Sequence, residues 1–340
     1  MSAPLRVGVL GVGRIGAMHA ALLAGQVDGA ALAGVADALP EAAGKAARSL
    51  GVAPYVPEAL IADPSIDAVA ICTPTDSHVE LIVAAAAAGK AIFCEKPLSL
   101  DLGEVDRALE AARRADAFVM VGFNRRYDPA HRAVQQAVAS GSTGAVHLLR
   151  ITSRDPAPPP VSYVKSSGGL FLDMTIHDFD MARYVAGSEV VEVFAKASVR
   201  ISPEIESLGD VDTAVVTLEH ENGCFSVIDN SRQATYGYDQ RVEVLGASGL
   251  AASENPLAHT AITADGAGFR AAVLPNFFIE RYRLSYLHQW QALVEAHATG
   301  EEPPTSGADG RAALVLGLCA KASLERHATV RVEEFAAIGH

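Results

Sequence analysis

The chain has 340 residues, of which 50% are hydrophobic and 20% charged, and its formal net charge is −13. A chain this rich in apolar residues is not intrinsically disordered, and its length favours two domains, each with its own core. The acidic balance disfavours nucleic acid and membrane surfaces as partners, whereas a small neutral substrate is not repelled.

The first 124 residues are predicted to alternate strands and helices. The expected strands are mostly continuous apolar runs, typical of parallel strands buried on both faces. They are Leu5–Gly11, Ala30–Asp37, Ala68–Pro74, Ala91–Pro97 and Ala117–Asn124. Helical patterns lie between them, as at His78–Ala88 and Gly103–Ala115. Repeated βα units of this kind predict a doubly wound parallel sheet.

Residues 125–340 have a different pattern, which predicts an α+β domain. A proline-rich connector at 156–160 precedes strand-like runs without intervening helices, so we expect a mostly antiparallel open sheet. These runs are Val190–Arg200, Val211–His220, Cys224–Asn230 and Arg241–Leu245. Asn222 and Gly223 predict a hairpin, because Asn-Gly supplies positive φ at both turn positions. Helices are expected to return at Phe277–Ala298 and Ala308–Arg326, and the terminal helix is a candidate to pack back on the first domain.

The four cysteines are scattered, each in an apolar run: Cys72, Cys94, Cys224 and Cys319. Without a C-x-x-C pair we expect reduced core residues, with a reactive thiol or a zinc site as the alternatives. The first residues run directly into a predicted strand, which leaves no room for a signal peptide. The longest apolar stretches are shorter than the roughly 20 residues that span a bilayer. We therefore expect a cytoplasmic protein.

A glycine-rich turn joins the first predicted strand to the first helix. Its sequence matches G-x-G-x-x-G, and its candidate cofactor-binding residues are Gly11, Gly13, Arg14, Ile15 and Gly16. Such glycines let the backbone approach a pyrophosphate, while the helix N-terminus supplies amides and partial positive charge. Asp37, 21 residues after Gly16, ends the second strand. A carboxylate there binds ribose hydroxyls and repels a 2′-phosphate, which favours NAD over NADP. The alternative is a structural turn with an exposed aspartate.

Polar residues also follow a third strand, at the carboxyl edge where doubly wound sheets bind ligands. Thr73, Pro74 and His78 are expected to line the cofactor there. The alternative is that these polar residues serve the fold, with Asp76 or Ser77 capping the following helix. Both roles can also hold together.

Glu95, Lys96 and Pro97 end a further strand on the same edge. A lysine at the lip of a nucleotide crevice can hydrogen-bond a reacting hydroxyl and stabilise a developing alkoxide. The residues alone do not separate this role from that of a solvated lysine.

The most informative segment of the second domain contains Asp173, His177 and Asp180. If it is helical, these side chains share one face. A carboxylate beside an imidazole suits a general base that works near neutral pH. The alternatives are a core histidine with satisfied hydrogen bonds and a metal site, although no further ligand stands out.

Taken together, the three motifs resemble the Gfo/Idh/MocA oxidoreductases, which include glucose–fructose oxidoreductase, inositol dehydrogenase and rhizopine-catabolism relatives. The resemblance covers essentially the whole chain: G-x-G-x-x-G at residues 11–16, E-K-P at 95–97 and D-x-x-x-H at 173–177. Residues 122–128, 173–180 and 230–241 are particularly similar to the inositol dehydrogenase branch.

The resemblance implies an NAD-binding Rossmann domain at residues 1–124 and a substrate-binding and oligomerisation domain at 125–340. It implies oxidation of a secondary alcohol by hydride transfer to NAD, without a metal. His177 takes the hydroxyl proton, Asp173 supports the relay, and Lys96, placed by a cis bond to Pro97, orients the alcohol and ribose. The implied substrate contacts are Asn124, Arg125, Thr175 and Tyr236, of which Asn124 departs from the residue types of the branch.

The implied substrate is a small neutral polyol, first of all myo-inositol, oxidised to an inosose. Scyllo-inositol, chiro-inositol and a pyranose sugar are the alternatives, and the chain is expected to be a homotetramer. Two other classes are the alternatives to a dehydrogenase: a glycosidase that uses NAD transiently and a non-catalytic NAD-binding regulator. The intact lysine, aspartate and histidine favour a dehydrogenase.

Overall fold

The computed structural model describes residues 3–336, which form two compact units. The first unit comprises residues 3–124 together with Leu284–Leu314, and the second comprises Arg125–Arg283 together with residues 315–336. Within the described residues, none of the helices has the length and apolar character needed to cross a membrane.

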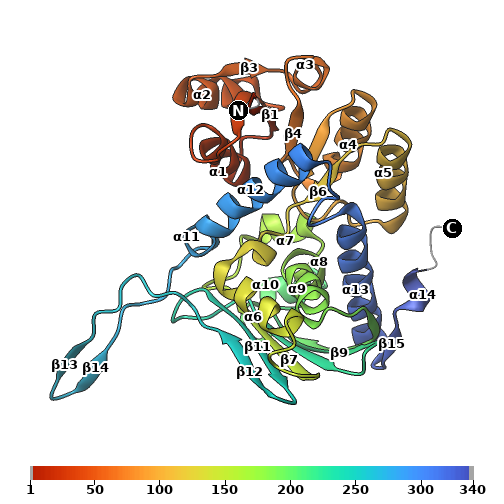
Figure 1. Cartoon of the computed structure of the whole chain (residues 1–340). Helices are drawn as coiled ribbons and strands as arrows, with labels where there is room; N and C mark the ends of the chain where they lie inside the picture. Colours follow the sequence, from red (N-terminus) through yellow and green to blue (C-terminus); the bar gives the residue numbers. More distant parts are fainter. Residues whose placement is uncertain (1–2, 337–340) are drawn as a thin grey trace. The chain divides into compact units, whose positions relative to one another are not determined.

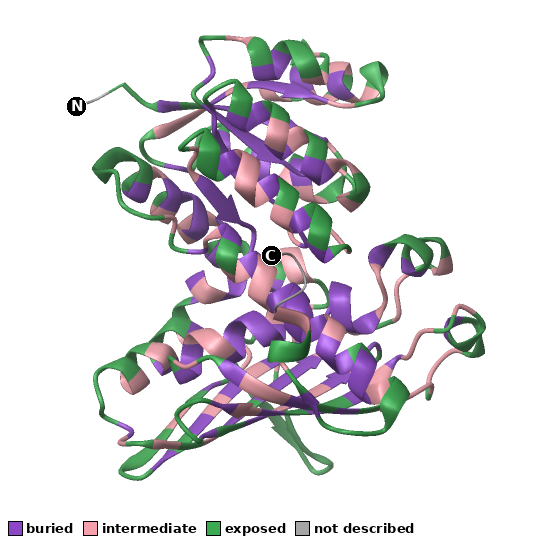
Figure 2. Cartoon of the chain, turned by 90° about the vertical axis from the view of Figure 1, so that its right-hand side faces the viewer, coloured by how far each residue is buried: buried purple, intermediate pink, exposed green. Residues whose placement is uncertain are grey.

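The first unit contains a six-stranded parallel sheet with the order β3-β2-β1-β4-β5-β6 (Figure 1). Its strands are β1 Leu5–Leu10, β2 Ala30–Ala36, β3 Ala53–Tyr55, β4 Ala68–Ile71, β5 Ala91–Cys94 and β6 Val119–Val121. The central strands are buried along their length, as their apolar runs predicted (Figure 2). The doubly wound parallel sheet is therefore confirmed, and the short strand β3 is an addition to it.

Helices follow the strands of this unit: α1 Arg14–Leu23, α2 Pro40–Leu50, α3 Pro57–Ala62, α4 His78–Ala87 and α5 Leu102–Arg114. Proline occupies the first turn of α2 and α3, where its fixed φ suits a helix start. Asp101 caps α5 by accepting a hydrogen bond from the amide of Glu104.

A later segment of the chain completes the same unit. The helix expected at Phe277–Ala298 is in fact two helices, α11 Phe278–Arg281 and α12 Arg283–Thr299, because Tyr282 leaves the helical conformation with φ −111°. Trp290 on α12 is 1% exposed and stacks on Phe93 of β5 with ring centroids 4.8 Å apart. The beginning of α13, Gly307–Arg326, also belongs to this unit.

The second unit contains a seven-stranded sheet with the order β12-β11-β7-β10-β9-β8-β15. Its strands are β7 Val146–Arg154, β8 Val190–Ser198, β9 Thr213–His220, β10 Phe225–Ser231, β11 Asp239–Gly246, β12 Gly249–Ser253 and β15 Val330–Arg331. The β7–β10 pair is parallel and the other pairs are antiparallel, so the mostly antiparallel sheet is confirmed. The inner strand β7 and the edge strands β12 and β15 were not predicted.

Helices pack on one face of this sheet, where α6 and α9 lie against β7 and β11. The helices of the unit are α6 Pro129–Ala139, α7 Val161–Ser167, α8 Leu170–Asp173, α9 Ile176–Ala186, α10 Pro203–Ser207, α11, α14 Glu333–Ala336 and the rest of α13. The opposite face carries exposed apolar side chains, such as Val215 and Phe225.

The expected hairpin joins β9 to β10, but its turn differs from the prediction. Gly223 has φ 82°, whereas Asn222 does not adopt a positive φ. The side chain of Asn222 instead accepts a hydrogen bond from the amide of Cys224. The turn therefore spans four residues, because the asparagine satisfies the backbone without a left-handed conformation. All four cysteines are buried and free, as expected of core residues.

Candidate active site

The glycine-rich turn closes β1 and opens α1, as predicted. Gly11 has φ +86°, and a Cβ on it would lie 2.8 Å from the backbone of Cys72. A Cβ on Gly16 would lie 1.9 Å from the carbonyl oxygen of Gly11. A Cβ on Gly13, by contrast, would meet nothing within 4 Å. Gly11 and Gly16 are thus required by the protein itself, and Gly13 leaves room on the solvent side.

The start of α1 lies beside that open space. Gly13 is the N-cap and supplies no side-chain cap, and the first turn holds no acidic residue. Arg14 is exposed and Ile15 half-buried, and the amides of a helix's first turn point toward its N-terminus. A pyrophosphate fits this arrangement, because it accepts such amides and is attracted by the helix dipole.

Asp37 follows β2 and reaches back to the glycine-rich turn. Its Oδ2 accepts a hydrogen bond from the amide of Val12 and its Oδ1 one from the amide of Leu39, both at 2.9 Å. The carboxylate is therefore held next to the turn while half-exposed. This placement agrees with contact to a ribose, since each carboxylate oxygen keeps further acceptor capacity.

His78, the first residue of α4, links two of the predicted cofactor segments. Its Nε2 lies 2.9 Å from the carbonyl oxygen of Thr73, and its Nδ1 lies 2.9 Å from that of Pro97. The ring is 1% exposed, and burial lowers its pKa while the two carbonyls oppose that shift. His78 therefore ties the end of β4 to the end of β5 from inside the protein. Ser77 does not cap α4; its hydroxyl binds Thr73 and Pro74.

Lys96 stands after β5, and the Lys96–Pro97 peptide bond is cis, as expected. The preceding Glu95 is buried, and its Oε1 lies 2.9 Å from His19 Nε2. Because Trp290 Nε1 donates to Nδ1 of His19, the imidazole donates from Nε2 to the carboxylate. Glu95 thus faces the interior and holds the backbone at Lys96.

Asn124 begins the 3-10 turn that follows β6 and is 2% exposed. Its backbone carbonyl accepts a hydrogen bond from the hydroxyl of Ser285 on α12, and its side-chain amide lies 3.4 Å from the same hydroxyl. Its role as a substrate contact stays a prediction.

The segment from Asp173 to His177 is not one helix. Asp173 ends α8 and His177 lies in the first turn of α9, with Met174 and Thr175 between the two helices. The amide of Thr175 binds the carbonyl of Leu170, five residues earlier, which widens the turn. The expected shared helix face therefore fails for Asp173 and His177, which the break separates, whereas His177 and Asp180 do lie three residues apart on one helix, α9. The hydroxyl of Thr175, at the break, donates to Asn230 at 2.6 Å.

Two side chains hold the carboxylate of Asp173. The hydroxyl of Tyr163 on α7 donates to Oδ1 at 2.8 Å, and the guanidinium of Arg232 lies 3.4 Å from Oδ2. Burial and the charge of Asp173 raise the pKa of Tyr163, so its hydroxyl remains a proton donor. Neither residue was singled out from the sequence, because no spacing rule links them to Asp173.

Asp155 follows the end of β7 and is a further acidic residue close to Asp173 and Arg232. Burial raises its pKa to about 6, Arg232 opposes the shift and Asp173 adds to it. Its position just before the proline-rich connector gave no chemical signal in the sequence.

Arg125 and Thr175 belong to one buried network. Arg125 Nη1 donates to Asp178 at 2.6 Å, and Asn230 donates to the other oxygen of Asp178 while accepting from Thr175. Arg125 is 5% exposed and Thr175 is 0% exposed. The structure thus brings two of the predicted substrate contacts together, both already bonded to protein side chains.

Tyr236 and Asp180 lie outside this network, each in a different cluster of charged side chains. Tyr236 is 52% exposed, donates to Asp239 at 2.7 Å and accepts from Arg154, so it joins a charged cluster at the end of β7. Asp180 is buried, and the guanidinium of Arg126 donates hydrogen bonds to both of its carboxylate oxygens. Its carboxylate is therefore engaged by an arginine. Over residues 3–336, no group of three histidine, cysteine or acidic side chains could hold a metal ion.

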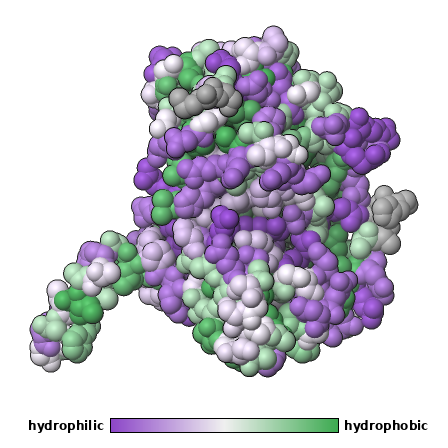
Figure 3. All heavy atoms as spheres, in the orientation of Figure 1, coloured by the Kyte–Doolittle hydropathy of each residue, from purple (hydrophilic) through white to green (hydrophobic). Residues whose placement is uncertain are grey.

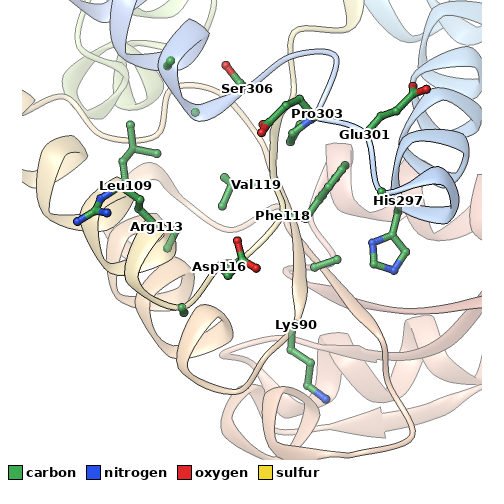
Figure 4. A pocket seen from close by; sticks show the side chains of 18 of the residues that line it. Lys90, Leu109, Arg113, Asp116, Phe118, Val119, His297, Glu301, Pro303 and Ser306 are labelled. Carbon is green, nitrogen blue, oxygen red and sulfur yellow. The ribbon is translucent and has the colours of Figure 1, made fainter.

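A pocket of about 670 Å³ lies at the opposite end of β5 and β6 in the first unit (Figure 4). Its lining includes Lys90, Asp116, Phe118 and His297. The ammonium of Lys90 is bound to the carbonyls of Asp63 and Ile66. The pocket lies at the amino ends of the strands, so the predicted cofactor residues do not line it.

Comparison with known proteins gives consistent results for both halves of the chain. A model described as an oxidoreductase family with an NAD-binding Rossmann fold matches residues 5–123, and a GFO/IDH/MocA C-terminal domain model matches residues 131–252. A myo-inositol 2-dehydrogenase of Thermotoga maritima is 49% identical over 332 residues, which cover 97% of this chain and 99% of that protein.

Two further relatives extend this result. An inositol 2-dehydrogenase of Rhizobium meliloti is 48% identical over 92% of this chain and 94% of its own. The crystal structure of scyllo-inositol dehydrogenase from Lactobacillus casei, with bound NAD(H) and scyllo-inositol, matches with a TM-score of 0.90 and 29% identity. That match covers 97% of this chain and 99% of the other.

Proposed function

Since the chain belongs to the Gfo/Idh/MocA family of NAD-dependent oxidoreductases, we propose that it oxidises one secondary hydroxyl of myo-inositol to an inosose. The observation that carries this proposal is the 49% identity, over 97% of the chain, to a protein named for that activity. The buried donors and acceptors around Asp173 and Arg125 support a neutral substrate with many hydroxyls, because such sites reject analogues that leave a partner unpaired.

In this proposal His177 accepts the proton of the reacting hydroxyl, as a general base does. Lys96 donates a hydrogen bond to the same oxygen and stabilises the negative charge that develops on it. Asp173, held by Tyr163 and Arg232, supports the proton transfer. NAD, when bound, supplies the acceptor for the hydride of the alcohol carbon. Gly11, Gly13, Arg14, Ile15, Gly16, Asp37, Thr73, Pro74, His78, Glu95 and Lys96 are proposed to form or support its site.

The test measures kcat/KM for myo-, scyllo- and chiro-inositol, glucose and an open-chain polyol, each with NAD and with NADP. We expect myo-inositol to rank first and NAD to be preferred, because the carboxylate of Asp37 repels a 2′-phosphate. A higher value for scyllo-inositol or glucose would change the substrate but not the reaction. An open-chain polyol ranking first would contradict the cyclitol assignment. Absence of NADH release with every compound would favour the glycosidase class.

We further propose that the protein is a cytoplasmic homotetramer. Val215, Phe225 and Leu245 are exposed on the outer face of the seven-stranded sheet, and apolar side chains on one face are typical of a surface buried between copies. The four buried free thiols suit a reducing compartment.

A further inference from the structure

A long excursion leaves the second unit between β12 and α11. We define residues 256–273 as the arm. Its strands β13 Thr263–Asp265 and β14 Gly268–Arg270 pair with one another, and residues 256–271 are all exposed (Figure 1). A hairpin with three residues in each strand is marginally stable in water when nothing packs on it. The arm therefore needs a surface to pack against.

Both ends of the arm are fixed to the same short stretch of the unit. Before the arm, Asn255 accepts a hydrogen bond from the amide of Gln240 at 2.9 Å and donates to Asp239 at 2.6 Å. After the arm, the carbonyl of Pro275 accepts from the amide of Tyr238 at 2.9 Å. These bonds hold the base in place, so the exposed hairpin emerges in a defined direction.

The exposed side chains of the arm are apolar. Phe269 is 85% exposed, Val273 74% and Ile262 65%, and hydrophobic residues gather on the projecting arm in Figure 3. Contiguous apolar surface of this kind marks an interaction site.

Charge identifies the class of partner. The arm contains one basic and one acidic residue, Arg270 and Asp265, and they pair with each other at 2.9 Å. It holds no lysine, and the whole chain carries a net charge of −13. Phosphate backbones and anionic lipids are therefore not attracted to it. A neutral, apolar element is typical of the core of a permanent protein interface.

The same unit has further exposed apolar side chains on the sheet from which the arm emerges. Leu250 on β12 and Leu245 on β11 form a cross-strand pair and are 58% and 44% exposed. One side of a standard interface contains roughly 20–30 residues. The 16 exposed residues at 256–271 approach that number.

We propose that the arm docks on a second copy of this chain, with the contact made reciprocally as in a two-fold interface. The proposal rests on the homo-oligomer proposed above and is independent of the inositol assignment, since association is measured without substrate.

The test compares the double variant Ile262→Asp/Phe269→Asp with a variant in which residues 258–272 are replaced by Gly-Ser-Gly, which keeps the anchors at both ends. Val56→Asp, on the first unit, is the matched control because Val56 is 54% exposed. Molar mass is measured by light scattering over a dilution series, and hydrogen exchange is measured on the wild-type arm. NAD binding and thermal unfolding report whether each variant folds.

We expect a wild-type multimer with slow exchange at residues 263–270. Both arm variants should dissociate at concentrations at least about tenfold higher than the wild type does, and Val56→Asp should behave as the wild type. An unchanged dissociation midpoint in both arm variants would overturn the docking while leaving the homo-oligomer intact. A monomeric wild type would overturn both, whatever its activity on inositols. Pelleting of the wild type, but not of the double variant, with phosphatidylserine vesicles would overturn the proposal in favour of a lipid surface.

Discussion

The presentation of the Asp173 carboxylate depends on a few individual side chains. Tyr163→Phe removes the hydroxyl that donates to Asp173 at 2.8 Å and keeps the ring. A hydrogen bond to a charged group contributes about 1.5–3 kcal/mol, so we expect kcat to fall roughly 10-fold or more with little change in NAD affinity. His177→Ala, measured alongside, should lower kcat by about 10²–10⁴-fold.

Tyr55→Phe is the matched control for that measurement. Tyr55 donates to Asp63 at 2.9 Å in the first unit, so this variant also loses one tyrosine–aspartate hydrogen bond. Its kcat should equal that of the wild type. If the two tyrosine variants behaved alike, the hydrogen bond from Tyr163 to Asp173 would make no contribution to kcat.

The raised pKa of Asp155 predicts how stability depends on pH. An acid whose pKa rises from 3.8 to about 6 on folding stabilises the folded state below the lower value, and this contribution is lost as the pH rises through the higher one. Asp155→Asn has no such loss. We expect its free energy of unfolding at pH 7.5 to exceed that of the wild type by about 2–3 kcal/mol. The difference should be smaller at pH 5.

Urea denaturation at the two pH values measures this difference. Asp63→Asn is the control with the opposite sign, because hydrogen bonds from Ser65 lower the pKa of Asp63. A constant difference between wild type and Asp155→Asn at both pH values would show that Asp155 does not titrate in this range.

The sequence predicts residues of the candidate site only where a spacing rule applies. Asp173 and His177 were found because four positions separate them. Tyr163, Arg232 and Asp155 were not found, because folding alone brings α7 and the ends of two strands to Asp173.

At the scale of elements, the turn from β1 to α1 contains glycines of two kinds. Gly11 and Gly16 have no room for a side chain within the protein, whereas Gly13 has open space that only a bound ligand would fill. Gly13→Ala places a methyl group in open space, so the variant should fold with unchanged thermal stability. We expect its Kd for NAD to rise at least about tenfold, because the methyl group occupies the room for the pyrophosphate.

Gly25→Ala, also in open space, is the control for the loss of a glycine. Isothermal titration with NAD measures both variants. An unchanged Kd for Gly13→Ala would mean that the pyrophosphate does not approach this side of the turn.

Elements were predictable where one pattern was consistent along a segment. The buried strands of the parallel sheet were found because their residues are apolar on both faces. β7 was not found, because Arg150 and Arg154 interrupt its apolar residues on the outer face and Ser153 places a hydroxyl on the inner one. The break between α8 and α9 was not predictable, because an i, i+4 spacing is compatible with either one helix or two.

For the whole molecule, the first compact unit is assembled from two stretches of the chain. Residues 3–124 carry all six strands, and Leu284–Leu314 adds α12 about 160 positions later. Trp290 on α12 packs on Phe93 and donates to His19, which in turn holds Glu95 beside Lys96. The hydrophobic pattern predicted a helix in this region but could not say which sheet it joins, because an apolar helix face fits either one.

This assembly predicts that residues 1–124 do not form a stable unit alone. Their isolated fragment lacks Trp290, and truncation of a buried tryptophan costs about 3–5 kcal/mol, a large part of the stability of a domain. We expect the fragment to unfold at least about 10 °C below a fusion in which a Gly-Ser linker joins it to residues 284–314. Thermal unfolding by circular dichroism and titration with NAD measure both proteins. Trp290→Ala in the fusion should reproduce much of the loss, whereas Leu284→Ala, at a position 55% exposed on the same helix, should not. If the isolated fragment bound NAD and unfolded at the temperature of the fusion, α12 would be dispensable to the nucleotide-binding fold.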